Sequence, residues 1–203
     1  MNKRIILLFL LIGLFHRYGI SQHSITPGVG FDEIQMEMEI SELIKIIGQP
    51  TSVRSRKQEK KRWKRNGYKT KRTFTFDLKF DSVYVFEKEN KYAIWKAFVK
   101  DDRAILYNLS SYIFDTLITQ EINVLDSVGF YDSVSRLSEI IGSDYYTKVD
   151  KNQNVEYIYF EKGIRFVAND SLLRNIYLFK PKIARRGLLK KLRLHRSEPK
   201  YIE

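Results

Sequence analysis

The feature that most constrains the fold is a series of short segments in which apolar and polar residues alternate. Ile34, Met36, Met38 and Ile40 alternate with acidic or amide residues, and Phe74 to Phe80 alternates in the same way. This period of two predicts half-buried strands of an antiparallel sheet. Segments that we interpret as strands lie at 33–40, 74–80, 83–86, 92–99, 118–125, 155–160, 164–167 and 173–179.

Two short helices are expected between these strands. The first begins after Ser41 as N-cap and ends at Gly48, before Pro50, and the second begins after Asp132 and ends at Gly142. Both helices end in Ile-Ile-Gly, which indicates an internal repeat of strand, helix and three strands, over about 31–100 and 117–181. The alternative is one domain that contains two similar helices by chance.

The predicted fold class is therefore α+β. Short helices pack on antiparallel sheet, and neither unit buries much apolar surface alone, so we expect the two meander units to share one core. The domain covers 22–181, carries a basic insertion at 54–72 and is followed by a basic tail at 182–203.

The N-terminus has the pattern of a signal peptide over residues 1–21. Lys3 and Arg4 precede an apolar run from Ile5 to Phe15, which is shorter than the roughly 20 residues of a membrane span. An uncleaved anchor or a buried strand are the alternatives. The chain has no cysteine, so we expect export to a bacterial periplasm or exterior without a lipoprotein-type cysteine anchor.

Three strings of the sequence resemble a known family. The strings are ELIKIIGQP, RLSEIIGSD and YIYFEKGIRFVANDSLLRNIYLF. They are similar to the helix, glycine turn and meander of small secreted folds of the outer-membrane assembly lipoprotein SmpA/OmlA and beta-lactamase-inhibitor-like type. The resemblance covers about 150 residues and implies a non-catalytic, protein-binding role.

Positive charge is concentrated in two segments. Residues 54–72 contain eleven basic residues and one acid, Glu59, and residues 180–200 contain nine basic residues and one acid, Glu198. Arginine and lysine mixed with aromatic rings are typical of polyanion sites, and a solvated loop is the alternative. The candidate polyanion-binding residues are Arg54, Arg56, Lys57, Lys60, Lys61, Arg62, Trp63, Lys64, Arg65, Arg185, Arg186, Lys190, Lys191 and Arg193.

The segment after Pro181 has the pattern of a basic amphipathic helix. Ala184, Leu188 and Leu192 recur at four-residue spacing and are surrounded by arginine and lysine. Such a helix suits a membrane surface or a partner groove. The alternative is a helix that docks on the sheet of its own chain.

Catalytic chemistry is weakly represented. The only histidines are His16, His23 and His195, all outside the expected folded body, so we predict no catalytic residue, no metal and no cofactor. Five aromatic residues are candidates for a cleft that takes an apolar or peptide ligand, with core packing as the alternative: Trp95, Phe98, Tyr107, Tyr112 and Phe114.

These patterns together favour a non-enzymatic, exported binding protein with an unknown protein partner. The alternative is association with an envelope polyanion or an anionic membrane through 54–72 and 182–200. A carboxylate-based periplasmic enzyme is the less favoured third hypothesis. Nucleic acid is disfavoured as a partner because export would separate the protein from it.

Overall fold

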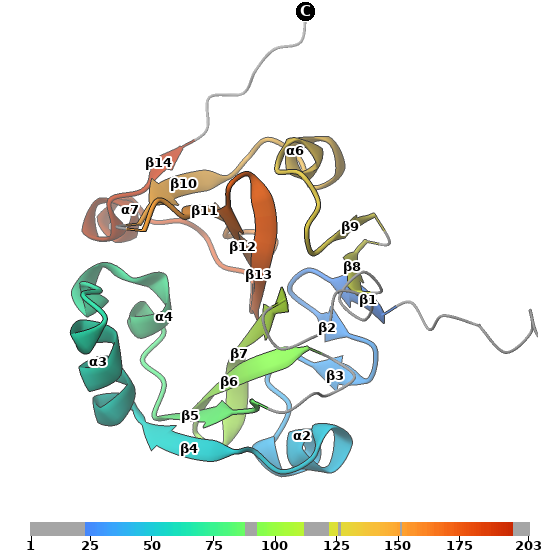
Figure 1. Ribbon diagram of the computed structural model, residues 1–203, viewed down its shortest axis with the longest axis vertical. Coiled ribbons are helices and arrows are strands. Elements are labelled where there is room, and N and C mark those ends of the chain that lie inside the picture. The colour runs from blue at the N-terminus through green and yellow to red at the C-terminus, as the bar shows by residue number, and fades with distance from the viewer. Residues whose placement is uncertain (1–22, 88–92, 112–121, 126, 151, 197–203) are drawn as a thin grey trace, which may run out of the picture.

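A computed structural model describes residues 23–87, 93–111, 122–125, 127–150 and 152–196. Its strands form two sheets of nine and five strands, and helices are arranged around them (Figure 1). The predicted α+β class is confirmed. Each helix in the described part of the chain falls short of the length and apolarity that a bilayer span requires.

The large sheet consists of two antiparallel meanders joined edge to edge. Its order is β14-β10-β11-β12-β13-β7-β6-β5-β4, and β7 pairs with β13 at the junction. The strands are β4 (Ser52–Ser55), β5 (Ser82–Val85), β6 (Ile94–Lys100), β7 (Arg103–Ser110), β10 (Tyr146–Val149), β11 (Val155–Tyr159), β12 (Ile164–Asn169), β13 (Leu172–Phe179) and β14 (His195–Arg196).

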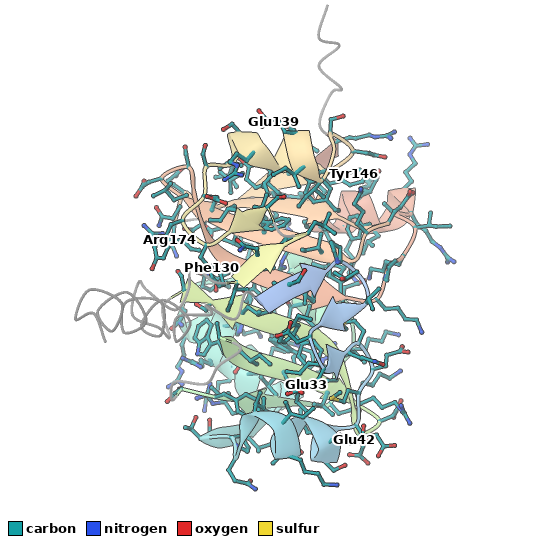
Figure 2. All side chains as sticks on the ribbon, turned by 90° about the vertical axis from the view of Figure 1, so that its right-hand side faces the viewer. Glu33, Glu42, Phe130, Glu139, Tyr146 and Arg174 are labelled. Atoms are coloured by element: carbon teal, nitrogen blue, oxygen red, sulfur yellow. The ribbon has the colours of Figure 1, made fainter. Side chains whose placement is uncertain are left out.

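The small sheet covers one face of the large sheet (Figure 2). Its order is β3-β2-β1-β8-β9, in which β1 and β8 run parallel. The small sheet therefore joins the strands that precede the first meander, β1 to β3, to those that precede the second meander, β8 and β9. The strands are β1 (His23–Thr26), β2 (Gly30–Phe31), β3 (Ile34–Gln35), β8 (Ile122–Val124) and β9 (Val128–Gly129).

The helices lie on two sides of the large sheet. In Figure 1, α3, α4 and α7 lie on one side of it and the small sheet lies on the other, while α2 and α6 flank its two ends. The helices are α2 (Ile40–Ile47), α3 (Arg56–Arg65), α4 (Phe74–Asp77), α6 (Ser135–Ile140) and α7 (Arg186–Leu192), with the 3₁₀ helix η1 (Thr70–Arg72).

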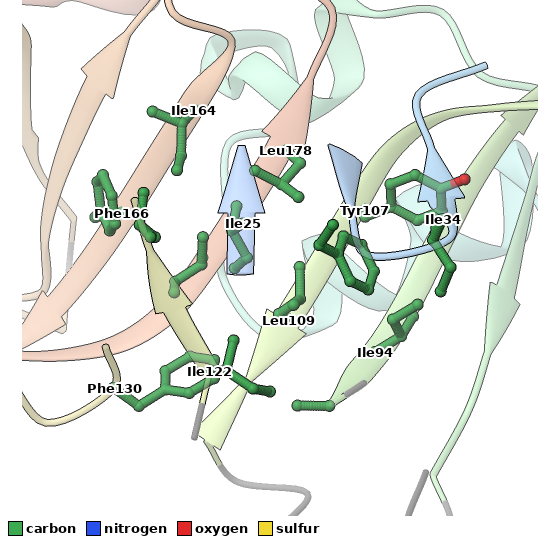
Figure 3. Packing of buried hydrophobic residues seen from close by; sticks show 14 of the residues in the cluster. Ile25, Ile34, Ile94, Tyr107, Leu109, Ile122, Phe130, Ile164, Phe166 and Leu178 are labelled. Carbon is green, nitrogen blue, oxygen red and sulfur yellow. The ribbon is translucent and has the colours of Figure 1, made fainter. Parts of the chain in front are cut away.

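One apolar core fills the space between the two sheets. Ile25 and Ile122 of the small sheet face Leu109, Leu178 and Phe166 of the large sheet (Figure 3). Both halves of the chain supply strands to this core, as expected of two meanders that share it.

A second apolar core lies on the opposite face of the large sheet. Phe74 and Phe76 of α4 pack there with Phe160 and Phe179, and the ring centroids of Phe74 and Phe179 are 4.7 Å apart. Leu192 of α7 is buried in the same core. The apolar side of the tail helix α7 therefore packs on the sheet of its own chain. This is the alternative considered above to a helix whose apolar side is free to bind a membrane or a partner.

Several sequence-based element predictions are wrong. Residues 74–80 form α4 and a turn instead of a strand, because three consecutive residues, Phe74, Thr75 and Phe76, are all buried against the sheet. The expected strand at 33–40 is reduced to β3, since Ile40 already begins α2. The expected cap Asp132 instead accepts a hydrogen bond from the Gly129 amide, and α6 begins at Ser135.

Seven of the described strands and the helix α3 were not predicted. The strands are β1, β2, β4, β7, β9, β10 and β14. Apolar residues on both faces of the central strand β7 hide its alternation. The basic stretch 54–72, expected to be irregular, contains α3. Ser55 and Gln58 form a capping box at its start, in which the Ser55 amide donates to Gln58 Oε1 at 2.7 Å.

Candidate functional site

A large cavity lies against the large sheet on the side of α3. It has a volume of about 710 Å³, and its roof comes from residues 62–73. We call it the sheet-face cavity. Its lining contains eight arginine and lysine side chains and two carboxylates, namely Arg62, Lys69, Arg72, Lys96, Lys148, Arg165, Arg174, Arg193, Asp150 and Glu156.

The floor of the cavity is a row of side chains that crosses the sheet. Lys96 lies opposite Asn108, Asn108 opposite Tyr177, and Tyr177 opposite Arg165, on strands β6, β7, β13 and β12. Residues directly opposite one another in antiparallel strands share a face. Lys96 and Arg165 therefore occupy corresponding places in the two meanders, on either side of the β7–β13 junction.

Lys96 is held by a buried acid from the basic segment. Glu59 of α3 is fully buried, and its Oε1 accepts hydrogen bonds from Lys96 Nζ at 2.8 Å and from Trp63 Nε1 at 2.9 Å. Burial raises the pKa of Glu59, but the Lys96 ammonium and these hydrogen bonds outweigh it, so the pKa lies below its ordinary value. Glu59 thus stays ionised and fixes α3 to the sheet.

Arg165 is the second buried cation, and its hydrogen bonding is less complete. Its side chain is 2% exposed, and its two terminal nitrogens reach Glu156 Oε2 at 3.4 Å and Thr75 Oγ1 at 3.3 Å. Its Nε has no hydrogen-bond partner among the described residues. The guanidinium stacks 3.7 Å from the centroid of the Tyr177 ring. Arg165 therefore keeps one unpartnered, buried N–H group beneath the cavity floor.

Further cations surround Arg165. Lys148 of β10 donates a hydrogen bond to the Arg72 carbonyl at 2.6 Å, which ties the sheet to the end of the basic segment. Burial lowers the pKa of Lys148, and the positive charges of Arg165 and Arg72 act in the same direction. This end of the cavity therefore carries more positive charge than Glu156 and Asp150 neutralise.

Both tryptophans of the chain line the sheet-face cavity. Trp63 lies between Tyr68 and Phe76, with ring centroids 5.2 and 5.3 Å away. Trp95 has the Lys96 ammonium 4.4 Å from its ring centroid. Tryptophan fluorescence is thus a direct probe of this cavity.

The structure distributes the candidate polyanion-binding residues over several places. Arg62, Trp63 and Arg193 line the sheet-face cavity. Arg54 forms ion pairs with Glu59 and Glu87, at 3.6 and 3.7 Å. Exposed side chains are those of Lys57, Lys61, Lys64, Arg65, Arg185, Arg186 and Lys190.

A smaller hollow joins the two basic segments. Its volume is about 410 Å³, and Arg56, Lys60 and Lys191 line it together with Lys71 and Arg72. The helix α7 contacts η1, and Lys191 Nζ forms an ion pair with Asp77 Oδ1 beside this hollow. Two segments that are far apart in the sequence therefore present their charges together.

The predicted aromatic cleft is divided by the fold. Trp95 and Phe98 line the sheet-face cavity, whereas Tyr107 lies in the core between the sheets, where its hydroxyl donates to the Gln35 carbonyl. Tyr112 and Phe114 fall outside the described residues.

Sequence reasoning missed the residues at the centre of the site. Lys96, Arg165 and Lys148 were not singled out, and Glu59 was counted only as the one acid in a basic stretch. A signal was present, because Arg165 interrupts an apolar strand between Ile164 and Phe166. A cation at an inward-facing strand position indicates a buried partner or a ligand.

A scan against protein-family models and searches of curated proteins and solved structures find no match to this chain. The family resemblance noted in the sequence therefore stays a prediction.

Proposed function

We propose that this chain is an exported, non-enzymatic binding protein that holds an anionic ligand in the sheet-face cavity. The observation that carries the proposal is Arg165, a cation that is 2% exposed and has an unpartnered Nε. A buried charge without full compensation is unfavourable. An anion that entered the cavity would add negative charge beside Arg165, whose hydrogen bond to Glu156 is long at 3.4 Å.

The charge of the whole lining supports the same conclusion. Its eight cations outnumber its two carboxylates, and they come from both meanders and from the basic segment. A cavity of a few hundred to about 1,000 Å³ with converging polar groups is typical of small-ligand sites. Charge-assisted hydrogen bonds from arginine are the strongest that proteins offer to carboxylates and phosphates.

The carboxylates of the cavity already have structural partners. Asp150 Oδ1 accepts hydrogen bonds from the amides of Asn152 and Asn154, and Asp150 Oδ2 accepts one from Asn154 Nδ2. Glu156 is paired with Arg165. These arrangements suit binding better than acid–base catalysis, and export remains a proposal from the N-terminal sequence pattern.

Tryptophan fluorescence tests the proposal. We expect small carboxylates or phosphates to change the emission saturably at low salt, and the midpoint to rise with ionic strength because screening weakens the attraction. Neutral compounds of similar size should leave the emission unchanged. An unchanged emission with every anion would contradict the proposal.

Variants of Arg165 localise the effect. R165K keeps the charge and R165M removes it, and we expect R165M to weaken anion binding by about tenfold or more, since a hydrogen bond to a charged group contributes about 1.5 to 3 kcal/mol. K57Q, which alters an exposed lysine of α3, is the matched control. Thermal unfolding confirms that each variant folds. If the R165M and K57Q variants bound the anion with equal affinity, the anion site would lie outside the sheet-face cavity.

A second candidate function is association with anionic membrane surfaces. It is favoured by the smaller hollow, where Arg56, Lys60 and Lys191 bring the two basic segments together. Each lysine or arginine near an anionic surface contributes about 1 kcal/mol.

Liposome sedimentation distinguishes this function from binding in the sheet-face cavity. We expect vesicles with anionic lipid, but not neutral vesicles, to sediment the protein at low salt, and high salt to release it. The triple variant K60Q/K61Q/K191Q should weaken sedimentation, and R165M should leave it unchanged. Equal binding to neutral vesicles would exclude the electrostatic mechanism.

A further inference from the structure

We infer that the ligand of the sheet-face cavity is a linear acidic oligosaccharide that lies across the strands. This inference rests on the proposed anion-binding function and names its ligand class. It is carried by the length of the cavity floor, the distribution of cations along it, the occupied faces of its aromatic rings and the amide side chains between them.

The floor is elongated across the sheet. Lining residues come from seven neighbouring strands, β14, β10, β11, β12, β13, β7 and β6. Lys96 on β6 and Lys148 on β10 are separated by five inter-strand spacings, which correspond to about 24 Å at about 4.8 Å each. This length follows the curve of the sheet around the cavity (Figure 1), and a lining that draws on seven strands suits a ligand of several linked units better than a single small anion.

Positive charge is present along the whole length. Arg62 lies beside Lys96 at one end, Arg165 lies in the middle, and Lys148 and Arg193 lie toward β14 at the other end. A ligand that matches this row carries repeated negative charges. Several linked contacts also raise affinity far more than one contact does.

The aromatic rings are unsuited to stacking with bases. The Lys96 ammonium lies over Trp95, the Arg165 guanidinium lies over Tyr177, and Trp63 is packed between Tyr68 and Phe76. Single-stranded nucleic acid gains much of its binding free energy from exposed rings. Trp95 and Tyr177 instead contact the cations Lys96 and Arg165.

Amide side chains complete the lining. Asn66, Asn108, Asn154 and Asn175 contribute to the cavity, and Asn108 Nδ2 lies 3.4 Å from Asn175 Oδ1 at the centre of the floor. An amide both donates and accepts hydrogen bonds, as sugar hydroxyls do. A lining that combines cations with amides therefore fits a chain that bears both acidic groups and hydroxyls.

A length series of oligogalacturonates tests the inference on the full chain. These linear oligomers carry one carboxylate on each sugar. We expect affinity, followed by tryptophan fluorescence, to rise by about tenfold or more from the monosaccharide to the oligomer that fills the floor, and then to level off. Neutral oligosaccharides of the same lengths should not bind.

A variant at one end separates length from charge. R62Q should weaken binding of the long oligomers by about threefold or more and leave the monosaccharide affinity unchanged, because the monosaccharide needs only Arg165. K61Q, the neighbouring exposed residue, is the matched control. An equal effect of R62Q on both ligands would overturn the extended arrangement.

The remaining outcomes separate this inference from the proposed function. If monosaccharide and long oligomers bind equally well, the linear ligand is wrong and the anion site stands. If inorganic polyphosphate, an acidic peptide or oligothymidylate of equal charge bound more tightly than the oligogalacturonates, the ligand would be that class of polyanion and not an oligosaccharide. Failure of every anion would overturn both proposals.

Discussion

Replacing Glu59 by alanine is expected to lower the free energy of unfolding by about 3 to 5 kcal/mol. Removal of one partner from a buried ion pair leaves the other charge without compensation, and Lys96 is only 5% exposed. Trp63 also loses the acceptor for its indole nitrogen, and Arg54 loses one of its two carboxylates. Urea unfolding of the E59A variant measures the loss.

E139A and E59L/K96M are the controls for this prediction. Glu139 is exposed on α6 (Figure 2), and its removal should change stability by no more than about 0.5 kcal/mol. The double variant replaces both charges by apolar side chains and should recover most of the loss. A loss below about 1 kcal/mol for E59A would show that Glu59 does not fix α3 to the sheet.

We expect acid to abolish the contribution of Glu59 to the free energy of unfolding. Its pKa is lower in the folded chain than the ordinary value of 4.5, so the unfolded chain takes up the proton first as the pH falls. The contribution is complete above pH 4.5 and is lost as the pH falls through the folded pKa. The stability difference between the natural chain and E59Q should therefore shrink in acid, and a constant difference would contradict this.

Replacing Gly163 by alanine is expected to cost about 3 kcal/mol or more. The residue has a φ of +69°, and a Cβ there would lie 2.2 Å from the Phe179 carbonyl oxygen and 2.8 Å from Gly28 Cα. Both neighbours are backbone atoms, so the strained conformation and the clash act together. Thermal and urea unfolding of G163A measure the cost.

Gly48 offers a matched comparison. Its φ is +94°, but a Cβ there would meet nothing within 4 Å. Its ψ of −178° places the residue in a backbone region that other residues rarely adopt, so G48A should cost about 1 to 3 kcal/mol from backbone strain alone. Equal losses in G48A and G163A would show that the close approach of Gly28 and Phe179 does not constrain the chain.

Period-two alternation predicted the fold class and five strands of the large sheet correctly. The strands β5, β6, β11, β12 and β13 lie where alternating residues indicated them, and both helices that end in Ile-Ile-Gly are present. Alternation failed at 74–80, because both sides of α4 are buried between the sheet and the basic segment. Local periodicity cannot show such tertiary burial.

The site was harder to predict than the fold. Charge alone identified the basic segment and Trp63, which form the roof of the cavity. The floor depends on Lys96 and Arg165. These two side chains lie on the same face of the sheet because of the register of four strands, β6, β7, β13 and β12. One of these strands, β7, was not predicted. Glu59 was overlooked because its importance follows from its contact with Lys96, 37 positions away.

The Nε–H resonance of Arg165 in ¹H–¹⁵N NMR spectra tests the central claim most directly. The Arg165 signal is assigned as the one that is absent from the spectrum of the R165K variant. Arg103 and Arg136, which form ion pairs on the surface, serve as internal references. We predict that titration with galacturonate moves the Arg165 signal saturably and leaves the reference signals in place. An Arg165 signal that stays fixed while the protein binds the anion would contradict an anion site in the sheet-face cavity.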